Sequence, residues 1–384
     1  MRKSALLAFG LVVAIIVALG LIVLSSASEA NGVRLYNDAY FFMKRQFAYL
    51  AVGILIAVGT ALFDYRKWRD HMFLSWFAFA VVFAMLLAVF PPIGRAINGS
   101  YRWINLGPLN LQPSEFAKLL TVIILSVWLD RVGWRVELFK HGAVVPGLLI
   151  GILAAPVMFE PDFGSTMVIG LVGFLVMLIA GVRMLHMFPF FALGGTALVY
   201  KVVTNANRMA RIAAFFGIKI EVGAEVMDAA AKRAAYQADQ ALVAIGNGGI
   251  WGVGLNQSMQ KHYYLPEAHT DFIFAIGAEE LGLPFSVATL LLFIAFFGLS
   301  LYIACKASDR LGRFLVMGMS FIIFFQAMFN IGVVCEALPT KGMALPFFSY
   351  GGTNMLSAFF AVGTILSVGI HSYTGNRKRK IQHG

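Results

Sequence analysis

The chain has 384 residues, of which 60% are hydrophobic and 13% are charged, and its mean hydropathy is +0.80. Soluble domains are about half apolar, so no soluble fold could bury this share of apolar surface. The net charge of +11 comes from Lys and Arg residues scattered between apolar runs, without the continuous basic stripe of a protein that binds nucleic acid. Composition therefore excludes a soluble domain and favours a membrane protein.

Apolar runs long enough to cross a bilayer recur along the chain. The hydrocarbon core is about 30 Å thick, so a spanning helix needs about 20 mostly apolar residues. Nine segments match: residues 5–24, 47–63, 72–90, 142–158, 166–182, 185–203, 285–305, 314–335 and 355–370. Residues 113–129 form a tenth candidate, in which Glu115 and Lys118 are expected to face inward. The sequence predicts an all-α polytopic membrane protein with about ten transmembrane helices, organised as one membrane domain over residues 1–384.

The distribution of Lys and Arg predicts the orientation of these spans. With the N-terminus inside, the cytoplasmic segments hold sixteen of them and the short outer loops hold six, as the positive-inside rule requires. An even number of spans then makes both termini cytoplasmic. The first span resembles a secretory signal, but its length and the spans behind it favour a retained helix. The basic run at residues 377–380 predicts contact with anionic membrane lipids or, alternatively, a solvated tail.

A large loop, residues 204–284, separates the seventh and eighth spans and is expected on the extracytoplasmic side. Its first half is Ala-rich with mixed charges and predicts a helix outside the bilayer. Its second half contains GNGGIWGVGLNQS and then YLPEAHTDFIFAIGAEELG. Pro266 suits a first helical position, and Gly282 with Pro284 suits a helix end. We therefore expect a helix over residues 266–281.

Two carboxylates stand one turn apart on that expected helix. At 100° per residue, Glu267 and Asp271 share a face with Ala275, Ala278 and Gly282, whose small size leaves room for a substrate. Mutual repulsion should raise the pKa of one carboxyl, as a general base requires. The alternative is that Glu267 complements the helix dipole and Asp271 is a hydrogen-bonded structural acid.

Further polar residues gather on the predicted outer side. Glu115 and Lys118 are spaced to pair with each other or to line a cavity. Asp162 either caps the helix that follows it or takes a direct role. Lys341 lies in a Gly- and Pro-rich segment and either enters the site or reaches the membrane interface. An outer cavity lined by Glu115, Lys118, Asp271 and Lys341 would suit an amphiphilic anionic substrate whose tail stays in lipid.

Other chemistries lack a signal in this sequence. The two cysteines, Cys305 and Cys335, suggest neither a disulfide framework nor a metal cluster. Gly351 and Gly352 lack the strand, lysine and hydroxyl context of a phosphate-binding loop, so we expect no nucleotide cofactor.

Five stretches make the sequence resemble the SEDS family of bacterial peptidoglycan glycosyltransferases, nearly end to end. They are YRWINLGPLNLQPSEFAKL, EPDFGS, GNGGIWGVGL, QKHYYLPEAHTDFIFAIGAEELG and LPTKGMALPFFSYGG. SMQKHYYLPEAHTDFIFA and LPTKG are more similar to the cell-division branch than to the elongation branch. The chain departs from the family pattern at Glu160, Ser165, Ala235 and Asn256. These departures bear on loop conformation and partner contacts more than on chemistry.

The resemblance implies polymerisation of lipid II on the outer face of the bacterial cytoplasmic (inner) membrane. The essential aspartate of the family falls on Asp271, which would deprotonate the acceptor sugar hydroxyl, and undecaprenyl pyrophosphate would leave with inversion. Lys118 and Lys341 are candidates for stabilising the charge of the leaving group. The residues that we assign to substrate binding are Arg102, Glu115, Lys118, Gln260, Lys261, Glu267, His269, Thr270, Lys341 and Ser349.

The resemblance also implies a divalent cation, Mg or Mn, whose ligands the sequence does not reveal. The implied partners are the growing glycan chain, a class B penicillin-binding protein and other divisome proteins. A lipid II flippase is a rival interpretation, although the polar motifs crowd the outer side, whereas transporter sites lie near the midplane. A scaffold that only recruits the transpeptidase is a third interpretation, and it would tolerate loss of Asp271.

Overall fold

The computed structural model describes residues 2–90, 95–97, 100–105, 110–160, 162–216, 224–262, 264–339 and 341–382. Helices and one small sheet make up most of these residues. The elements in chain order are α1 (Arg2–Tyr36), α2 (Phe41–Leu62), α3 (Lys67–Asp70), α4 (Met72–Ala88), β1 (Arg95–Ile97), β2 (Ser100–Asn105), β3 (Asn110–Leu111), α5 (Pro113–Val132), the 3-10 helix η1 (Gly133–Glu137), the π-helix η2 (Phe139–Val144), α6 (Val145–Phe159), α7 (Phe163–Ala180), α8 (Met184–Val203), α9 (Ala206–Phe216), α10 (Ala224–Gly248), α11 (Ile273–Cys305), α12 (Arg310–Val334) and α13 (Gly352–Gln382).

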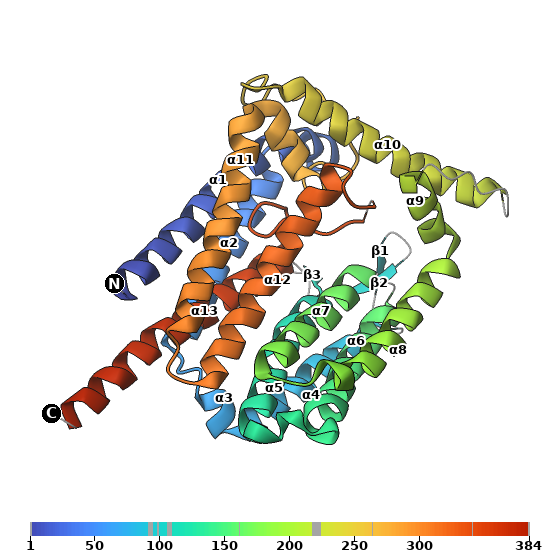
Figure 1. Ribbon diagram of the computed structural model, residues 1–384. Helices are drawn as coiled ribbons and strands as arrows, with labels where there is room; N and C mark the ends of the chain where they lie inside the picture. The colour runs from blue at the N-terminus through green and yellow to red at the C-terminus, as the bar shows by residue number, and fades with distance from the viewer. Residues whose placement is uncertain are drawn as a thin grey trace.

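The long helices form one bundle, and a smaller layer covers one of its ends (Figure 1). Both termini lie toward the end of the bundle that also holds α3, whereas α9, α10 and the three strands lie toward the opposite end. The helices α9 and α10 confirm that the first half of the large loop is helical. Because α10 packs on α9 and on α11, this layer is attached to the bundle.

Within the described part of the chain, eight helices are long and apolar enough to cross a membrane. They are α1, α2, the continuous helix formed by η2 and α6, α7, α8, α11, α12 and α13. The other two predicted spans are also helical: α4 is apolar but has 17 residues, and α5 has 20 residues including charged ones. The all-α polytopic class is therefore confirmed, and the total of ten crossings stays a prediction.

The charged helix α5 lies inside the bundle, packed against α4, α6, α7 and α12. Fifteen of its 20 residues are buried. The Lys118 ammonium lies 2.7 Å from Glu115 Oε1, and the Ser357 hydroxyl donates to Glu115 Oε2 at 3.0 Å. Charges inside a membrane protein are tolerated when they pair in this way. The expected inward orientation and pairing of Glu115 and Lys118 are confirmed.

A three-stranded antiparallel sheet, in the order β1-β2-β3, lies between α4 and α5. Ile97 is opposite Ser100 in the first strand pair, and Ile104 is opposite Leu111 in the second. The sequence analysis did not predict these strands, since the longest of them has six residues and carries no sustained alternation. The sheet places Arg102 beside the turn between α6 and α7, where its Nε donates to the Glu160 carbonyl oxygen at 3.3 Å.

The helix expected over residues 266–281 is wrong in its first half. Residues 266–272 form turns, Glu267 has φ of 59°, and α11 begins at Ile273. The cause is tertiary: Ser349 Oγ donates to the Thr270 carbonyl at 2.5 Å, and Tyr350 N donates to the His269 carbonyl at 3.0 Å. These two carbonyls would otherwise accept the helical N–H groups four residues later. Glu267 and Asp271 therefore do not share a helix face.

The stop signal at Gly282 and Pro284 is confirmed as a break inside α11. Gly282 has φ 71° and ψ −159°, so the helix divides there into an outer and a longer inner part. Pro284 has no N–H to donate to the Glu280 carbonyl. Gly254 N donates to that carbonyl instead, at 3.0 Å. Residues 249–254, which we call the glycine-rich turn, thus complete the hydrogen bonds of a broken helix.

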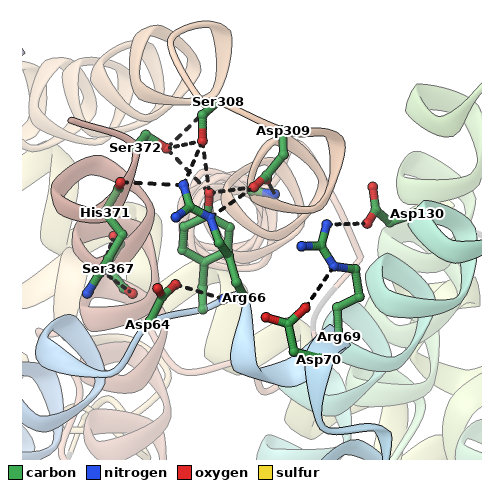
Figure 2. Close-up of polar contacts among 12 residues, drawn as sticks. Asp64, Arg66, Arg69, Asp70, Asp130, Ser308, Asp309, Ser367, His371 and Ser372 are labelled. Carbon is green, nitrogen blue, oxygen red and sulfur yellow. Dashed lines mark hydrogen bonds and ion pairs between the residues drawn. The ribbon is translucent and has the colours of Figure 1, made fainter. Parts of the chain in front are cut away.

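A polar network ties the helices together at the end opposite the glycine-rich turn (Figure 2). Arg66 Nε lies 3.3 Å from Asp309 Oδ2, and its guanidinium also donates to the His371 carbonyl at 3.4 Å. Arg69 pairs with Asp130 of α5 at 3.2 Å. The network joins the α2–α3 corner, the α11–α12 corner and α13, which fixes this end of the bundle.

Candidate active site

Asp271 lies in the turn just before α11, where three segments meet. Asn330 of α12 donates from Nδ2 to the Asp271 carbonyl and to the Met343 carbonyl, both at 2.7 Å. The carboxylate itself lies against Gly342, where a Cβ would come within 2.3 Å of Oδ2. Only glycine leaves room for the carboxylate at position 342.

The environment of Asp271 suits a proton acceptor. Burial and, to a smaller extent, the negative charge of Glu267 raise its pKa to about 7, against the opposing charges of Arg211 and Arg102. The expected raised pKa is confirmed, although burial is a larger cause than carboxylate repulsion. A group with a pKa near 7 is available both to accept and to release a proton under physiological conditions.

The residues that flank Asp271 in sequence hold its turn in place. Thr270 Oγ1 donates to Glu267 Oε2 at 2.8 Å. The His269 ring packs against Phe42, with ring centroids 4.8 Å apart, and its Nδ1 lies 3.2 Å from Asn31 Nδ2. Burial lowers the pKa of His269. The contacts of Glu267, His269 and Thr270 therefore stabilise the turn that carries Asp271. The substrate-binding roles assigned to these residues stay predictions.

Ser349 also contributes to this support. Besides its bond to the Thr270 carbonyl, its oxygen accepts a hydrogen bond from Leu345 N at 2.8 Å. It is buried, so it joins the segment between α12 and α13 to the Asp271 turn. Its assignment to substrate binding likewise stays a prediction.

Lys341 and Arg208 share one aromatic ring beside the site. The Arg208 guanidinium lies 3.6 Å from the centroid of the Phe163 ring, and the Lys341 ammonium lies 5.9 Å from it. Burial lowers the pKa of Lys341 to about 8; the charge of Asp162 opposes this shift, whereas neighbouring arginines add to it. Contact with an aromatic face stabilises a cation without neutralising its charge.

Arg208 and Arg211 were missed by the sequence analysis. Both lie on α9, three residues apart, in the loop half that was read only as a mixed-charge helix. Burial and repulsion from Arg102 lower the pKa of each; Arg211 adds to the shift at Arg208, and Asp271 opposes the shift at Arg211. Their i, i+3 spacing could have indicated a shared basic face. Arg102, Arg208, Arg211 and Lys341 together form what we call the cationic cluster.

Asp162 caps α7, which is one of the two roles expected from the sequence. Its carboxylate accepts from Ser165 N at 3.2 Å, Ser114 Oγ at 3.0 Å and Gln112 Nε2 at 3.1 Å. Burial opposes ionisation, but the charge of Arg102 and the hydrogen bonds from Ser165 outweigh it and hold the pKa of Asp162 below its ordinary value. This anion partly balances the cationic cluster.

The expected four-residue cavity is assembled only in part. The segment that carries Lys341 reaches Asp271, because the next residue, Gly342, contacts the Asp271 carboxylate, whereas the Lys341 ammonium lies near Phe163. Lys118 is 1% exposed and pairs with Glu115. It lies one helical turn after Ser114, whose hydroxyl donates to the Asp162 carboxylate. Lys118 and Glu115 thus lie under the site, inside the bundle, and their direct contact with substrate stays a prediction.

Gln260 and Lys261 lie in a different buried cluster. Lys261 Nζ lies 3.4 Å from Glu280 Oε1 and 2.9 Å from Ser26 Oγ, with both members of the ion pair almost fully buried. Gln260 N donates to Glu279 Oε2 at 3.4 Å. These contacts join residues 260 and 261 to α1 and α11. The substrate-binding roles of Gln260 and Lys261 stay predictions.

The residues present do not by themselves form a metal site. Across the described ranges, no group of three His, Cys, Asp or Glu side chains is placed to hold a metal ion. Around Asp271 the neighbouring charges are mostly cationic. The divalent cation therefore stays a prediction, and no step below depends on it.

The fold and the site together define a polytopic membrane protein with a partly buried acid on its covered end. A family model described as cell cycle protein, FtsW/RodA/SpoVE, matches residues 6–374. The chain belongs to this family, which is the one that its motifs resemble.

Two relatives support this membership. It is 36% identical over 357 residues to "Probable peptidoglycan glycosyltransferase FtsW" of Coxiella burnetii, covering 92% of this chain and 93% of the relative. It is 38% identical over 360 residues to the protein of the same name from Thioalkalivibrio sulfidiphilus, covering 92% and 86%.

Rod shape determining protein RodA of Thermus thermophilus is similar in structure, with a TM-score of 0.68, 25% identity and coverage of 95% and 96%. A chain from "Structural coordination of polymerization and crosslinking by a peptidoglycan synthase complex" has a TM-score of 0.72 at 24% identity, covering 95% and 97%, and shares the fold.

Proposed function

We propose that this chain is a peptidoglycan glycosyltransferase that polymerises lipid II into glycan strands for cell division. The observation that carries the proposal is Asp271, a partly buried acid with a pKa raised to about 7, held against Gly342 beside the cationic cluster. The relatives named FtsW support the septal role over a role in elongation.

In this mechanism Asp271 is the general base. Its carboxylate takes the proton of the acceptor sugar hydroxyl as that oxygen forms a bond to the anomeric carbon of the donor. The bond from that carbon to the diphosphate oxygen breaks with its electron pair, and the anomeric configuration inverts. Because one face of the sugar is attacked while the diphosphate leaves from the other, the base and the leaving-group site must lie apart.

The cationic cluster is suited to the leaving diphosphate. Lys341 and Arg208 lie on one aromatic ring, and Arg102 reaches the same region from the sheet. Fixed cations that face a developing negative charge stabilise the transition state more than the ground state. Lys118, proposed from the sequence for this task, is occupied by Glu115. Arg208 and Arg211 are better placed for it.

The proposed setting is the bacterial inner membrane, with both termini cytoplasmic and the layer of α9 and α10 outside. The excess of Lys and Arg in the segments on the same side as the termini, sixteen against six in the short outer loops, supports this orientation. The proposed partners are lipid II, the growing glycan chain, membrane lipids, a class B penicillin-binding protein and other divisome proteins. The structural neighbour described as part of a peptidoglycan synthase complex supports a synthase partnership.

The test is polymerisation of labelled lipid II by the purified protein, with and without partner and divalent cation, comparing wild type with Asp271→Asn. We expect glycan strands from wild type and none from the variant, at an unchanged melting temperature. Equal polymer from both proteins would reject Asp271 as the base. Lipid II binding without polymer from either, under every condition, would favour a flippase, and full support of the transpeptidase by the inactive variant would favour a scaffold.

A further inference from the structure

The inner part of α11 carries an exposed apolar stripe. Leu283, Val287, Leu291 and Ile294 are each about half exposed. Their spacing of four, four and three residues places them on one face of the helix. An apolar face on a membrane span is expected to contact lipid or another transmembrane helix.

The glycine-rich turn extends this stripe beyond the end of the span. Leu283 N donates to the Gly249 and Ile250 carbonyls, both at 3.2 Å, so the turn adjoins the first residue of the stripe. Ile250 is 63% exposed and Trp251 is 84% exposed. Two large apolar side chains therefore stand unpacked next to the outer end of a lipid-facing helix.

The length of α11 places this turn at the membrane surface. The inner end of the helix is Cys305, followed by the basic residue Lys306. About 20 helical residues cross a hydrocarbon core of about 30 Å, so counting back from Cys305 places the opposite boundary near Pro284. Trp251, beside Leu283, therefore lies at the level of the headgroups, where tryptophan is enriched.

The glycine-rich turn also contacts the outer part of α11, which directly follows the turn that carries Asp271. A Cβ at Gly252 would lie 2.2 Å from the Glu280 carbonyl oxygen, so the two backbones are in direct contact. Val253 N donates to the Glu279 carbonyl at 2.9 Å. Only the short outer part of α11 separates this contact from Asp271.

We propose that Ile250 and Trp251 insert into the outer-leaflet interface of the bilayer and anchor the catalytic turn at a fixed depth. The partner is the lipid surface itself: apolar acyl segments for Ile250, and the boundary with the headgroups for the amphipathic indole. The insertion stands independently of the proposed function. Its consequence, that Asp271 is held at the height of a lipid-linked diphosphate, rests on that function.

The test measures the fluorescence that Trp251 contributes in liposomes, as the difference between wild type and Trp251→Phe. The liposomes contain phospholipids brominated near the start or near the end of the acyl chain, or receive iodide in the water. Trp103→Phe, in strand β2 of the outer layer, is the matched control. Neither variant needs activity to be read, so failure here is distinguishable from failure of the proposed function.

We expect the Trp251 signal to be quenched by bromine near the headgroups more than by deep bromine, and to be shielded from iodide. The Trp251→Phe protein should lose this lipid-quenched component, while Trp103→Phe should keep it. A Trp251 signal that iodide quenches and brominated lipid does not would overturn the proposal. Shielding from both would also overturn it, since another protein surface would then cover the turn.

Discussion

The carboxyl of Asp271 and the ammonium of Lys341 have pKa values moved toward each other by their surroundings. Burial raises the first to about 7 and lowers the second to about 8. Both pKa values therefore lie near neutral pH, where the proposed reaction needs an ionised Asp271 and a protonated Lys341. This tuning depends on neighbours from other segments, since Asp271 contacts Gly342 and Lys341 lies near Phe163.

We expect polymerisation to follow a bell-shaped pH profile. Activity should rise through about pH 7 as Asp271 loses its proton, and fall above about pH 8 as Lys341 loses its charge. Lys341→Arg should move the falling limb to higher pH, because arginine stays protonated. Initial rates at saturating lipid II from pH 5 to 10 are the measurement. A rising limb with the same midpoint pH in Asp271→Glu would contradict the assignment of Asp271. A falling limb with the same midpoint pH in Lys341→Arg would contradict the assignment of Lys341.

Removing one member of the buried Lys261–Glu280 pair should destabilise the fold. Lys261→Ala leaves a buried carboxylate without its cation, which typically costs about 3–5 kcal/mol. The exposed pair Lys44–Asp38 is the control, because Lys44→Ala should leave the melting temperature almost unchanged. Thermal melts in one detergent compare the two. Equal melting temperatures for both variants would show that the buried pair is not important for stability.

At the scale of elements, the break in α11 and the glycine-rich turn act as one unit. The turn supplies Gly254 N to a carbonyl that Pro284 leaves unpaired, and Gly252 and Gly282 let the backbones touch. A continuous helix in this place would remove both the turn and its hydrogen bonds. The break therefore sets where the outer part of α11, and with it Asp271, lies above the membrane span.

Gly252→Ala should disrupt this unit. Gly252 has φ of 79°, and an added Cβ would meet the Glu280 carbonyl oxygen at 2.2 Å. The backbone strain and the steric overlap together should lower the free energy of unfolding by more than about 2 kcal/mol. Gly246→Ala is the control, since Gly246 lies in α10 and a Cβ there meets nothing within 4 Å. We expect loss of polymerisation and faster hydrogen exchange over residues 249–272 in the first variant only. Wild-type exchange and activity in Gly252→Ala would refute the role of the turn.

At the scale of the whole molecule, the candidate site is assembled from segments far apart in sequence. The cationic cluster draws on β2, α9 and the α12–α13 connection, and the acid lies before α11. The two α9 arginines belong to the layer that covers the bundle end (Figure 1). Binding of an anionic substrate should therefore depend on how this layer is docked.

Arg208→Gln and Arg211→Gln should each raise the KM for lipid II about tenfold or more, because a hydrogen bond to a charged group is worth about 1.5–3 kcal/mol. Their effect should shrink at high salt, because counterions compete for charges that the substrate can reach. Arg183→Gln is the control, since Arg183 pairs with Glu137 on the surface. A KM that stays at the wild-type value in the Arg208→Gln, Arg211→Gln double variant would place the diphosphate elsewhere.

The sequence by itself determined the class of the protein, the places of its apolar helices and the motifs of its family. These depend on local quantities: the length of an apolar run, the charges that flank it, and glycine or proline at a break. Spacing indicated the break at Gly282, and it offered the pairing of Glu115 with Lys118 and the cap at Asp162 each as one of two alternatives; the structure has all three.

Only the tertiary structure decided what surrounds Asp271. Ser349 and Tyr350 take the carbonyls that a helix over residues 266–281 would have used, so the acid stands in a turn. Arg211 acts on its charge from α9, a helix some sixty residues earlier in the chain. Contacts between distant segments outweigh local helical preference because each satisfies a buried polar group whose desolvation would otherwise be uncompensated.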